Sequence, residues 1–261
     1  MNTSRFAGYW QGTPREFFPM CGRYRLTNPE RYGELNDVRL GGGIPRRFNI
    51  SPTQKVLVVL DESPHESTEV RWGLIPSWAS DRKIASSLIN ARCETVATKP
   101  AFRTAFKKRR CLVPADGFYE WQKVGTGKQP YNIGMKNGEP FAFAGLWETW
   151  QDPESKEQVR TCSIITTSPN ELTAPIHDRM PVILSKEKRA AWLEPGRDVE
   201  ELKSFLVPYP ASQMDAYPIS PLVGSPKIDD PKLIERYEPA ALPQKPQKIQ
   251  PDAGQEQGSL F

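Results

Sequence analysis

The sequence predicts an α+β fold: a single domain with a mainly antiparallel β-sheet core and short flanking helices. Proline makes up 26 of the 261 residues, about twice its usual share. The prolines are scattered between short apolar runs, as expected where turns join short strands. Turn signals such as Gly125-Thr-Gly-Lys128 and Lys136-Asn-Gly138 separate several of these runs. This pattern argues against long helices and against a doubly wound parallel sheet.

Apolar runs and turn signals place the individual elements. A first helix is expected from Pro29 to about residue 35, because Thr27 or Asn28 offers a cap and proline suits the first turn. Phe102 and Phe106, spaced i and i+4, predict a short amphipathic helix over residues 101–108. Ser185 and Asp198 are expected to cap two further helices. Strands are predicted over residues 56–60, 70–75, 111–113, 118–122, 131–135, 141–147, 160–167 and 182–184.

Composition changes at both ends of the chain. Residues 1–20 match no periodic template and are interpreted as a leader or as a mis-assigned start. Residues 239–261 mix proline with Gln, Lys and Gly, which is typical of a flexible tail. The folded domain is therefore expected to span residues 21–238.

Charge and cysteine content exclude several classes of protein. The net charge of +4 permits an anionic partner without requiring one. No apolar run approaches the 18 residues of a membrane span, so no membrane association is expected. The four cysteines form no Cys-x-x-Cys pair and there are only two histidines, so neither a metal site nor a disulfide framework is predicted. A reduced, cytoplasmic monomer without cofactors is the simplest expectation.

Two ionisable residues stand in settings that suit catalysis. His177 lies in a loop bracketed by prolines, although a hydrogen bond to Asp178 or to a backbone carbonyl would explain it equally well. Glu120 lies between Tyr119 and Trp121 in a strand-like run, so it faces the side opposite these aromatics. Such a carboxyl group either pairs with a cation or has a raised pKa suited to proton transfer. An outward-facing surface glutamate is the alternative. The other histidine, His65, is interpreted as an exposed loop residue.

Polar and basic residues suggest contacts with an anion. Asn90 and Arg92 follow an apolar pair and would share one face of a strand, although an Asn turn followed by a surface Arg is the simpler interpretation. Residues 99–110 carry six cations and no acid, so the positive charge is localised. Contact with nucleic-acid phosphates is one interpretation and a solvated helix face is the other.

Cys21 differs from the other cysteines, which resemble small buried hydrophobic residues. It follows Met20, so translation from Met20 and removal of that methionine would make Cys21 the N-terminal residue. An N-terminal cysteine carries a thiol and an α-amine on neighbouring carbons, with ordinary pKa values of about 8.5 and about 7.7–8.0. This 1,2-aminothiol condenses with an aldehyde to an imine and then closes to a thiazolidine, which an internal cysteine cannot do.

Six ordered motifs resemble those of the SRAP (SOS response-associated peptidase) family, also called abasic site processing proteins. The resemblance covers about residues 20–238. The motifs are Met20-Cys-Gly-Arg-Tyr24, Arg47-Phe-Asn-Ile-Ser-Pro52, Arg71-Trp-Gly-Leu-Ile-Pro-Ser-Trp78, Asn90-Ala-Arg-Cys-Glu-Thr95, Cys111-Leu-Val-Pro-Ala-Asp-Gly-Phe-Tyr-Glu-Trp121 and Ile176-His-Asp-Arg-Met-Pro181. The resemblance implies a single α+β domain with a barrel-like antiparallel sheet. Such a domain would bind single-stranded DNA and link its N-terminal cysteine to the aldehyde of an abasic site, in the DNA damage response.

The resemblance also implies roles for individual residues. Cys21 would be the nucleophile and Asn90 would position its amine or the sugar. Glu120 would act as general acid and base, and His177 would assist ring opening and reversal. The residues implied to contact DNA are Arg23 and Arg92 at phosphates and Asn49, Pro52, Trp78 and Thr166 along the channel. Residues ahead of Cys21 block its amine in the sequence as written, and Gly224 and Ile228 stand where family members often have asparagine.

Three functions remain open at this level: a DNA–protein crosslinker, a thiol peptidase that uses Cys21 and His177 and could remove its own leader, and a DNA-binding module with an inert cysteine. The chain end Gln257-Gly-Ser-Leu-Phe261 adds a possible partner. It resembles the short peptide with which bacterial repair proteins dock on the sliding clamp, through Gln257, Leu260 and Phe261. A polar tail that ends by chance in two apolar residues is the alternative. Clamp binding would associate the protein with the nucleoid.

Overall fold

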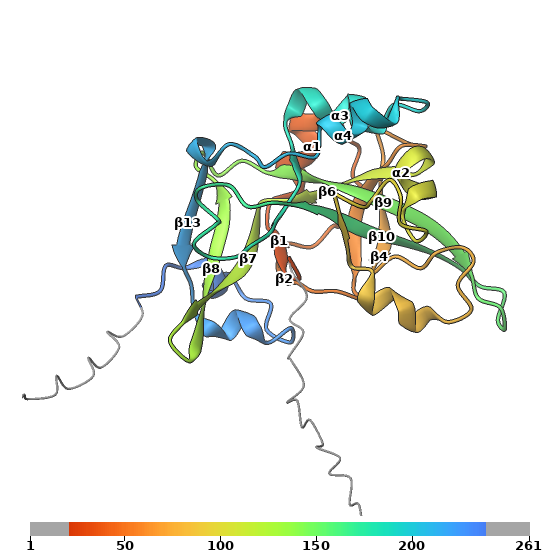
Figure 1. The fold of residues 1–261 in the computed structure, drawn as a ribbon. Coiled ribbons are helices and arrows are strands. Elements are labelled where there is room, and N and C mark those ends of the chain that lie inside the picture. Colours follow the sequence, from red (N-terminus) through yellow and green to blue (C-terminus); the bar gives the residue numbers. More distant parts are fainter. Residues whose placement is uncertain (1–20, 239–261) are drawn as a thin grey trace, which may run out of the picture.

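The computed structural model describes residues 21–238, which form two β-sheets and a set of short helices (Figure 1). The first sheet has five strands in the order β13-β8-β7-β1-β2, and all its neighbours are antiparallel. Its strands are β1 (Tyr24–Leu26), β2 (Arg47–Ile50), β7 (Gly117–Val124), β8 (Gly127–Met135) and β13 (Met214–Pro218).

The second sheet is larger and has eight strands, with β10 near its centre. Most of its pairs are antiparallel, but β4 and β5 both run parallel to β10. The predicted α+β fold with a mainly antiparallel, barrel-like core is confirmed. The strands are β3 (Lys55–Leu60), β4 (Ser67–Trp72), β5 (Asn90–Arg92), β6 (Arg110–Ala115), β9 (Phe141–Gln151), β10 (Gln158–Thr167), β11 (Met180–Pro181) and β12 (Ile183–Leu184).

Short helices begin where the capping residues are. The carboxylate of Asp198 accepts hydrogen bonds from the backbone N–H groups of Glu200 and Glu201, and Asn28 caps α1 through Arg31 N. In Figure 1, α1, α3 and α4 gather at one end of the molecule and α2 lies beside β9. The helices are α1 (Pro29–Asn36), α2 (Arg103–Lys108), α3 (Lys186–Leu193) and α4 (Val199–Ser204), with 3-10 helices η1 (Arg82–Ser87), η2 (Ala211–Gln213), η3 (Pro221–Gly224) and η4 (Pro231–Ile234).

Apolar side chains fill two main clusters, one on each face of the larger sheet. Trp72 and Phe143 belong to the inner cluster, where Tyr24 and Phe118 from the smaller sheet meet them. Phe106 and Trp192 belong to the outer cluster, beneath α2 and α3. Both faces of the larger sheet are buried where these clusters cover it, which is why strands such as β3 and β6 are continuous apolar runs, whereas β4 alternates.

The predicted elements all have counterparts in the fold, with shifted boundaries. The clearest difference is at residues 70–75, where the strand ends at Trp72 instead of Ile75. Gly73 has a φ of +120°, and its missing Cβ would lie 2.9 Å from the carbonyl oxygen of Ala85. The chain turns out of the sheet here, because only glycine adopts this conformation at such a close approach. Cys93 is half-buried, whereas Cys111 and Cys162 lie in the core as expected.

None of the helices between residues 21 and 238 has the length and apolar character that a membrane crossing requires. In the same range, no group of three or more His, Cys, Asp or Glu side chains is arranged to hold a metal ion.

Candidate active site

Cys21 and Glu120 meet because β1 pairs with β7. Tyr24 lies opposite Phe118, and antiparallel pairing then brings the residues before Tyr24 beside those after Phe118. The backbone nitrogen of Cys21 donates a hydrogen bond of 2.8 Å to Oε1 of Glu120. Both side chains are buried, with 4% of Cys21 and 3% of Glu120 exposed. The interpretation of Glu120 as an outward-facing surface residue is therefore wrong.

His177 approaches the same carboxylate from a loop between β10 and β11. Its Nε2 lies 4.0 Å from Oε2 of Glu120, and the side chain is 24% exposed. Its Nδ1 accepts a hydrogen bond of 3.1 Å from the backbone N–H of Arg179 and lies 3.0 Å from Oδ1 of Asp178. Because Nδ1 accepts from Arg179, a neutral ring carries its proton at Nε2, on the side of Glu120.

Burial changes the pKa of the Glu120 carboxyl group and of the Cys21 thiol. Desolvation raises the pKa of Glu120, and His177 and the contact with Cys21 offset this only in part. Desolvation and then the negative charge of Glu120 raise the pKa of the Cys21 thiol well above its ordinary value. At neutral pH the thiol is therefore protonated, and the site holds no preformed thiolate.

Asn90, Arg92 and Thr166 lie together where β5 runs parallel to β10. Asn90 is half-buried, Arg92 is exposed, and the pairing sets Arg92 beside Thr166. Asn90 and Arg92 share one face of the strand, as predicted, so the interpretation of this stretch as an Asn turn is wrong. The side chain of Thr166 is fully buried.

Arg23 and Asn49 hold the C-terminal segment, residues 219–234, against the smaller sheet. The guanidinium of Arg23 donates to the carbonyl oxygens of Val223 and Gly224 at 2.7 and 3.0 Å and to Oδ1 of Asn49 at 2.9 Å. The side-chain amide of Asn49, a residue only 1% exposed, donates to Val223, Ser225 and Ile228 carbonyls. These bonds use backbone oxygens, so the residues at 224 and 228 do not need asparagine side chains to be held.

Pro52 and Trp78 lie at the surface of the domain. Pro52 is half-buried in the turn between β2 and β3. Trp78 is 63% exposed in the loop that follows β4, and it is the most exposed large hydrophobic residue in the described range. An exposed indole is a suitable platform for stacking a nucleobase.

Arg179 belongs to the site, although the sequence analysis assigned it no role. Its guanidinium pairs with Glu94 and donates to the carbonyl oxygen of Thr166 at 2.7 Å. Hydrogen bonding to Arg179 lowers the pKa of Glu94 to about 2. The signal in the sequence was its position in the His177 motif, two residues after the histidine.

The basic segment over residues 99–110 splits into different environments. Arg110 is fully buried, and Arg109 pairs with Glu148 at 2.6 Å. The exposed cations that remain are Lys99, Arg103, Lys107 and Lys108. His65 is exposed, as expected, and its Nδ1 lies 3.1 Å from the carbonyl oxygen of Asp37.

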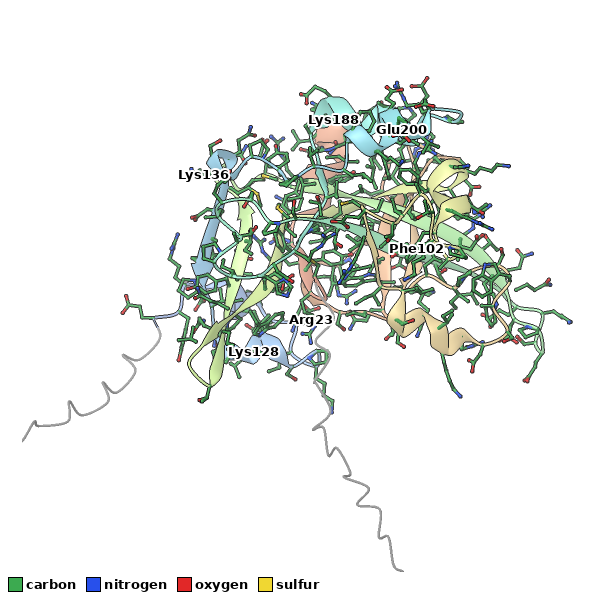
Figure 2. All side chains as sticks on the ribbon, viewed as in Figure 1. Arg23, Phe102, Lys128, Lys136, Lys188 and Glu200 are labelled. Carbon is green, nitrogen blue, oxygen red and sulfur yellow. The ribbon has the colours of Figure 1, made fainter. Side chains whose placement is uncertain are left out.

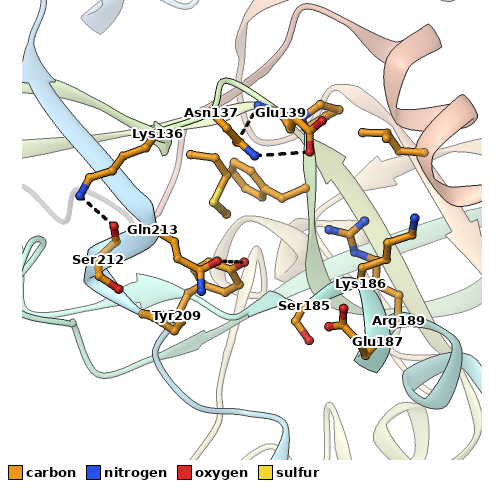
Figure 3. Close-up of a pocket in the computed structure, with 15 residues that line it drawn as sticks. Lys136, Asn137, Glu139, Ser185, Lys186, Glu187, Arg189, Tyr209, Ser212 and Gln213 are labelled. Carbon is orange, nitrogen blue, oxygen red and sulfur yellow. Dashed lines mark hydrogen bonds between the residues drawn. The ribbon is translucent and has the colours of Figure 1, made fainter.

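Two cavities of similar size lie away from the predicted site residues. One, of about 600 Å³, is bounded by the β8–β9 turn, the start of α3 and the stretch before β13 (Figure 3). A second, of about 610 Å³, lies between α1 and α3. None of the predicted site residues lines either cavity. Figure 2 shows Arg23 on the opposite side of the molecule from Lys136, which lines the first cavity.

Comparison with known proteins identifies the family. Residues 20–226 match the family described as SOS response associated peptidase (SRAP). The chain belongs to the SRAP family. The resemblance of its six motifs is thereby confirmed.

Relatives and solved structures extend the SRAP match over most of the domain. Abasic site processing protein YoqW of Bacillus subtilis is 44% identical over 230 residues, covering 84% of this chain and 100% of the relative. Abasic site processing protein YedK of Escherichia coli is 31% identical over 227 residues, covering 83% and 99%. A crystal structure of a Bacteroides thetaiotaomicron protein superposes with a TM-score of 0.76 at 30% identity, covering 84% and 100%.

Proposed function

We propose that this protein captures abasic sites in single-stranded DNA by forming a covalent thiazolidine through an N-terminal Cys21. The relatives named abasic site processing proteins support the choice of DNA lesion. The free amine would arise by translation from Met20 and removal of that methionine, or by cleavage of a leader over residues 1–20. Those residues, like the tail over 239–261, lie outside the described range, and residues 21–238 are proposed as the functional domain.

The reaction needs only the amine, the thiol and the aldehyde. The Cys21 amine attacks the aldehyde carbon, so that a C–N bond forms and the C=O π bond breaks. The resulting hydroxyl is protonated and leaves as water, which gives an imine. The thiol sulfur then adds to the imine carbon, and the thiol proton ends on the ring nitrogen. No oxidant, metal or cofactor is required.

Proton transfers are assigned to Glu120, which contacts the Cys21 nitrogen, and to His177, which lies beside Glu120. Glu120, 2.8 Å from that nitrogen, takes a proton from the ammonium and later protonates the leaving hydroxyl. Its raised pKa makes it a stronger base than an ordinary carboxylate and lets it return the proton at neutral pH. His177, with Nε2 directed toward Glu120, would assist opening of the sugar ring and reversal of the link. Asn90 would position the amine or the sugar.

The proposed DNA contacts lie around the Cys21 site. Arg92 and Arg23 are proposed to bind phosphates beside the lesion, and Trp78 to stack a base. Pro52 would line the channel. Thr166 was expected there too, but its side chain is fully buried, so it would act only through Arg179, which donates to its carbonyl oxygen. Asn49 would act indirectly, by holding the C-terminal segment, residues 219–234, in place.

The acidity of the Cys21 thiol favours crosslinking over the alternative of a thiol peptidase. A peptidase cysteine needs a lowered pKa, usually from a nearby cation or a helix N-terminus. Burial and Glu120 act on the Cys21 thiol in the opposite direction. The observation that carries the proposal is the direct contact between Glu120 and the backbone nitrogen of Cys21.

One experiment separates these functions. Protein with a free Cys21 amine, protein that retains Met20, and a Cys21→Ser variant are each incubated with single-stranded DNA that carries an abasic site, and adducts are resolved on a denaturing gel. We expect a heat-stable adduct only with the free amine and the thiol together. Glu120→Gln should form it roughly 10²-fold more slowly. An equal adduct yield when Met20 blocks the amine would contradict the thiazolidine. Intact-mass measurement of protein from the native gene establishes the true start.

Association with the sliding clamp stays a prediction, because Gln257, Leu260 and Phe261 lie outside the described residues. Deleting Leu260 and Phe261 should abolish clamp binding in calorimetry and leave crosslinking to free oligonucleotides unchanged.

A further inference from the structure

A small pocket beside β4 carries positive charge and has no assigned role. Its volume is about 240 Å³, and Lys55, Arg71 and Arg82 line it together with Thr53. Glu157 is the one carboxylate in its lining. Asp152, which pairs with Arg82 at 2.6 Å, lies just outside. Among the residues that the structure describes, Lys55 and Arg71, unlike Arg82, therefore have no paired carboxylate.

Lys55 and Arg71 face each other across neighbouring strands. They are direct partners in the antiparallel register of β3 and β4, so their side chains leave the sheet on the same face. Like charges placed directly opposite each other destabilise a sheet. Within residues 21–238, neither side chain makes a hydrogen bond or an ion pair. A bound anion would remove this repulsion.

Backbone strain occurs at the rim of the same pocket. Thr53 has a φ of +72°, a conformation that β-branched residues rarely adopt. Hydrogen bonds fix it there, since its N–H donates to Trp72 O at 2.9 Å and Trp72 N–H donates to Gln54 O at 2.9 Å. Strained residues of this kind cluster at ligand sites. The Thr53 side chain is exposed in the pocket, where its hydroxyl can donate to an anion.

The sheet register relates this pocket to β5, the strand that carries Asn90. Arg71 pairs with Thr161 and Asn90 pairs with Ile164 along the same strand, β10. These two positions are three residues apart, about 10 Å at the usual rise of a strand, so Asn90 faces the inner side of the sheet and Arg71 the outer side. Arg71 lies between the inward-facing Val70 and Trp72, so it points to the outer face of the sheet.

A DNA strand that leaves the Cys21 site would cross the rim at Pro52 and Trp78 to reach the pocket. Trp78 follows in the loop between β4 and β5, and its indole is free to stack a base on this path. A phosphodiester beyond that base would arrive at Lys55 and Arg71. Among anions, a phosphate of the strand already bound has the highest effective concentration there.

We propose that Lys55, Arg71 and Thr53 bind a backbone phosphate of the captured strand, outside the nucleotides that contact the Cys21 site. This inference rests on the proposed function. The pocket acts as an electrostatic anchor that reads no sequence, and Trp78 spaces it from the lesion. Arg82, already paired with Asp152, supports the charge of the pocket.

Noncovalent binding of intact single-stranded oligonucleotides tests the anchor. Affinity is measured against salt for two series, in which a tetrahydrofuran abasic analogue without an aldehyde is extended stepwise on its 5′ or its 3′ side. In one series, Arg71→Ala should weaken binding of the longer members about 3- to 10-fold and reduce the salt slope by about 0.7. It should leave the shortest members unaffected. Glu157→Gln, which removes the lining carboxylate, should strengthen binding of the same longer members.

The controls separate this anchor from the Cys21 site and from a general charge effect. Lys186→Ala removes an exposed cation at the distant cavity and should change neither series. An unchanged length dependence in Arg71→Ala, or equal weakening at every length, would overturn the anchor. A wild-type protein that binds but never crosslinks would overturn the proposed function and leave the anchor standing.

Discussion

The carboxyl group of Glu120 shows how one residue can carry both the chemistry and a cost in stability. It is buried beside the Cys21 nitrogen, and desolvation raises its pKa. The raised pKa suits proton transfer at neutral pH. It also means that ionisation of Glu120 opposes folding until a positive charge is placed next to it.

A pH dependence of stability follows for protein that retains residues ahead of Cys21. Between the ordinary carboxyl pKa of about 4.3 and the raised value, folded protein holds a proton on Glu120 that the unfolded chain has lost. Wild-type stability therefore falls as pH rises through this window, whereas Glu120→Gln has no such loss. The Tm advantage of Glu120→Gln should therefore grow as the pH rises above about 4. With a free Cys21 ammonium beside Glu120, the growth should be smaller. Parallel Tm curves for the two proteins at every pH would contradict this account.

Thr53 gives a second prediction at the residue scale, through its φ of +72°. A non-glycine residue in this region costs of order 1 kcal/mol, which glycine does not incur. Thr53→Gly should raise Tm by about 2–4 °C in thermal unfolding. Thr53→Ala keeps a Cβ in the same conformation and is the matched control, expected to gain less. If Thr53→Gly lowers Tm, the strain is not stored at this residue.

At the scale of elements, Arg110 joins the C-terminal ends of two helices, α2 and α3. Its guanidinium donates to Phe106 and Lys107 carbonyls at the end of α2, and to Trp192 and Glu194 carbonyls at the end of α3. A positive charge at two helix C-termini is favourable, because unsatisfied carbonyls concentrate negative potential there. The residue is fully buried, so it serves packing and cannot contact DNA.

Arg110→Met should therefore be strongly destabilising. The side chain keeps its approximate volume, but four buried carbonyl groups lose their donors. We expect a loss of about 3–5 kcal/mol in the free energy of unfolding, measured by urea denaturation. Lys108→Met, at an exposed position nearby, should stay within about 0.5 kcal/mol of wild type. Equal stability of the two variants would show that other groups satisfy these carbonyls.

At the scale of the whole molecule, the C-terminal segment, residues 219–234, packs against the first two strands, β1 and β2. Arg23, Asn49 and Asp229 join the two ends of the domain, and Asp229 accepts hydrogen bonds from Phe48 and Asn49 backbone nitrogens. Ile219, Val223 and Leu233 pack against Tyr119 on the outer side of β7. The strand that carries Glu120 is thus supported from behind by residues about 100 positions later.

Arg92 and Arg23 should consequently respond differently to truncation. Arg92→Ala removes an exposed side chain, so it should lower the salt dependence of single-stranded DNA binding by about one phosphate contact and leave Tm unchanged. Arg23→Ala should weaken binding and also lower Tm, because it frees the Val223 and Gly224 carbonyls. Salt titrations and thermal unfolding of both variants provide the check. An unchanged salt slope in Arg92→Ala would exclude this residue as a phosphate ligand.

The sequence by itself determined the longer strands, the helices and the reactive groups, because these depend on local chemistry, whereas short strands such as β1, β2 and β13 were not predicted. The capping of α4 by Asp198, the amphipathic spacing of Phe102 and Phe106, and the placement of Glu120 opposite its aromatic neighbours are all set within a few residues. The aminothiol of Cys21 is likewise a property of one residue and its position.

Only the tertiary structure decided which polar residues face each other and which are buried. It raised the pKa of the Cys21 thiol, buried Arg110 away from a basic surface, and committed Asn49 to carbonyls 174 to 179 positions away. It also brought Lys55 beside Arg71. Burial and charge pairing depend on strand register between distant segments, and no local pattern in the chain encodes that register.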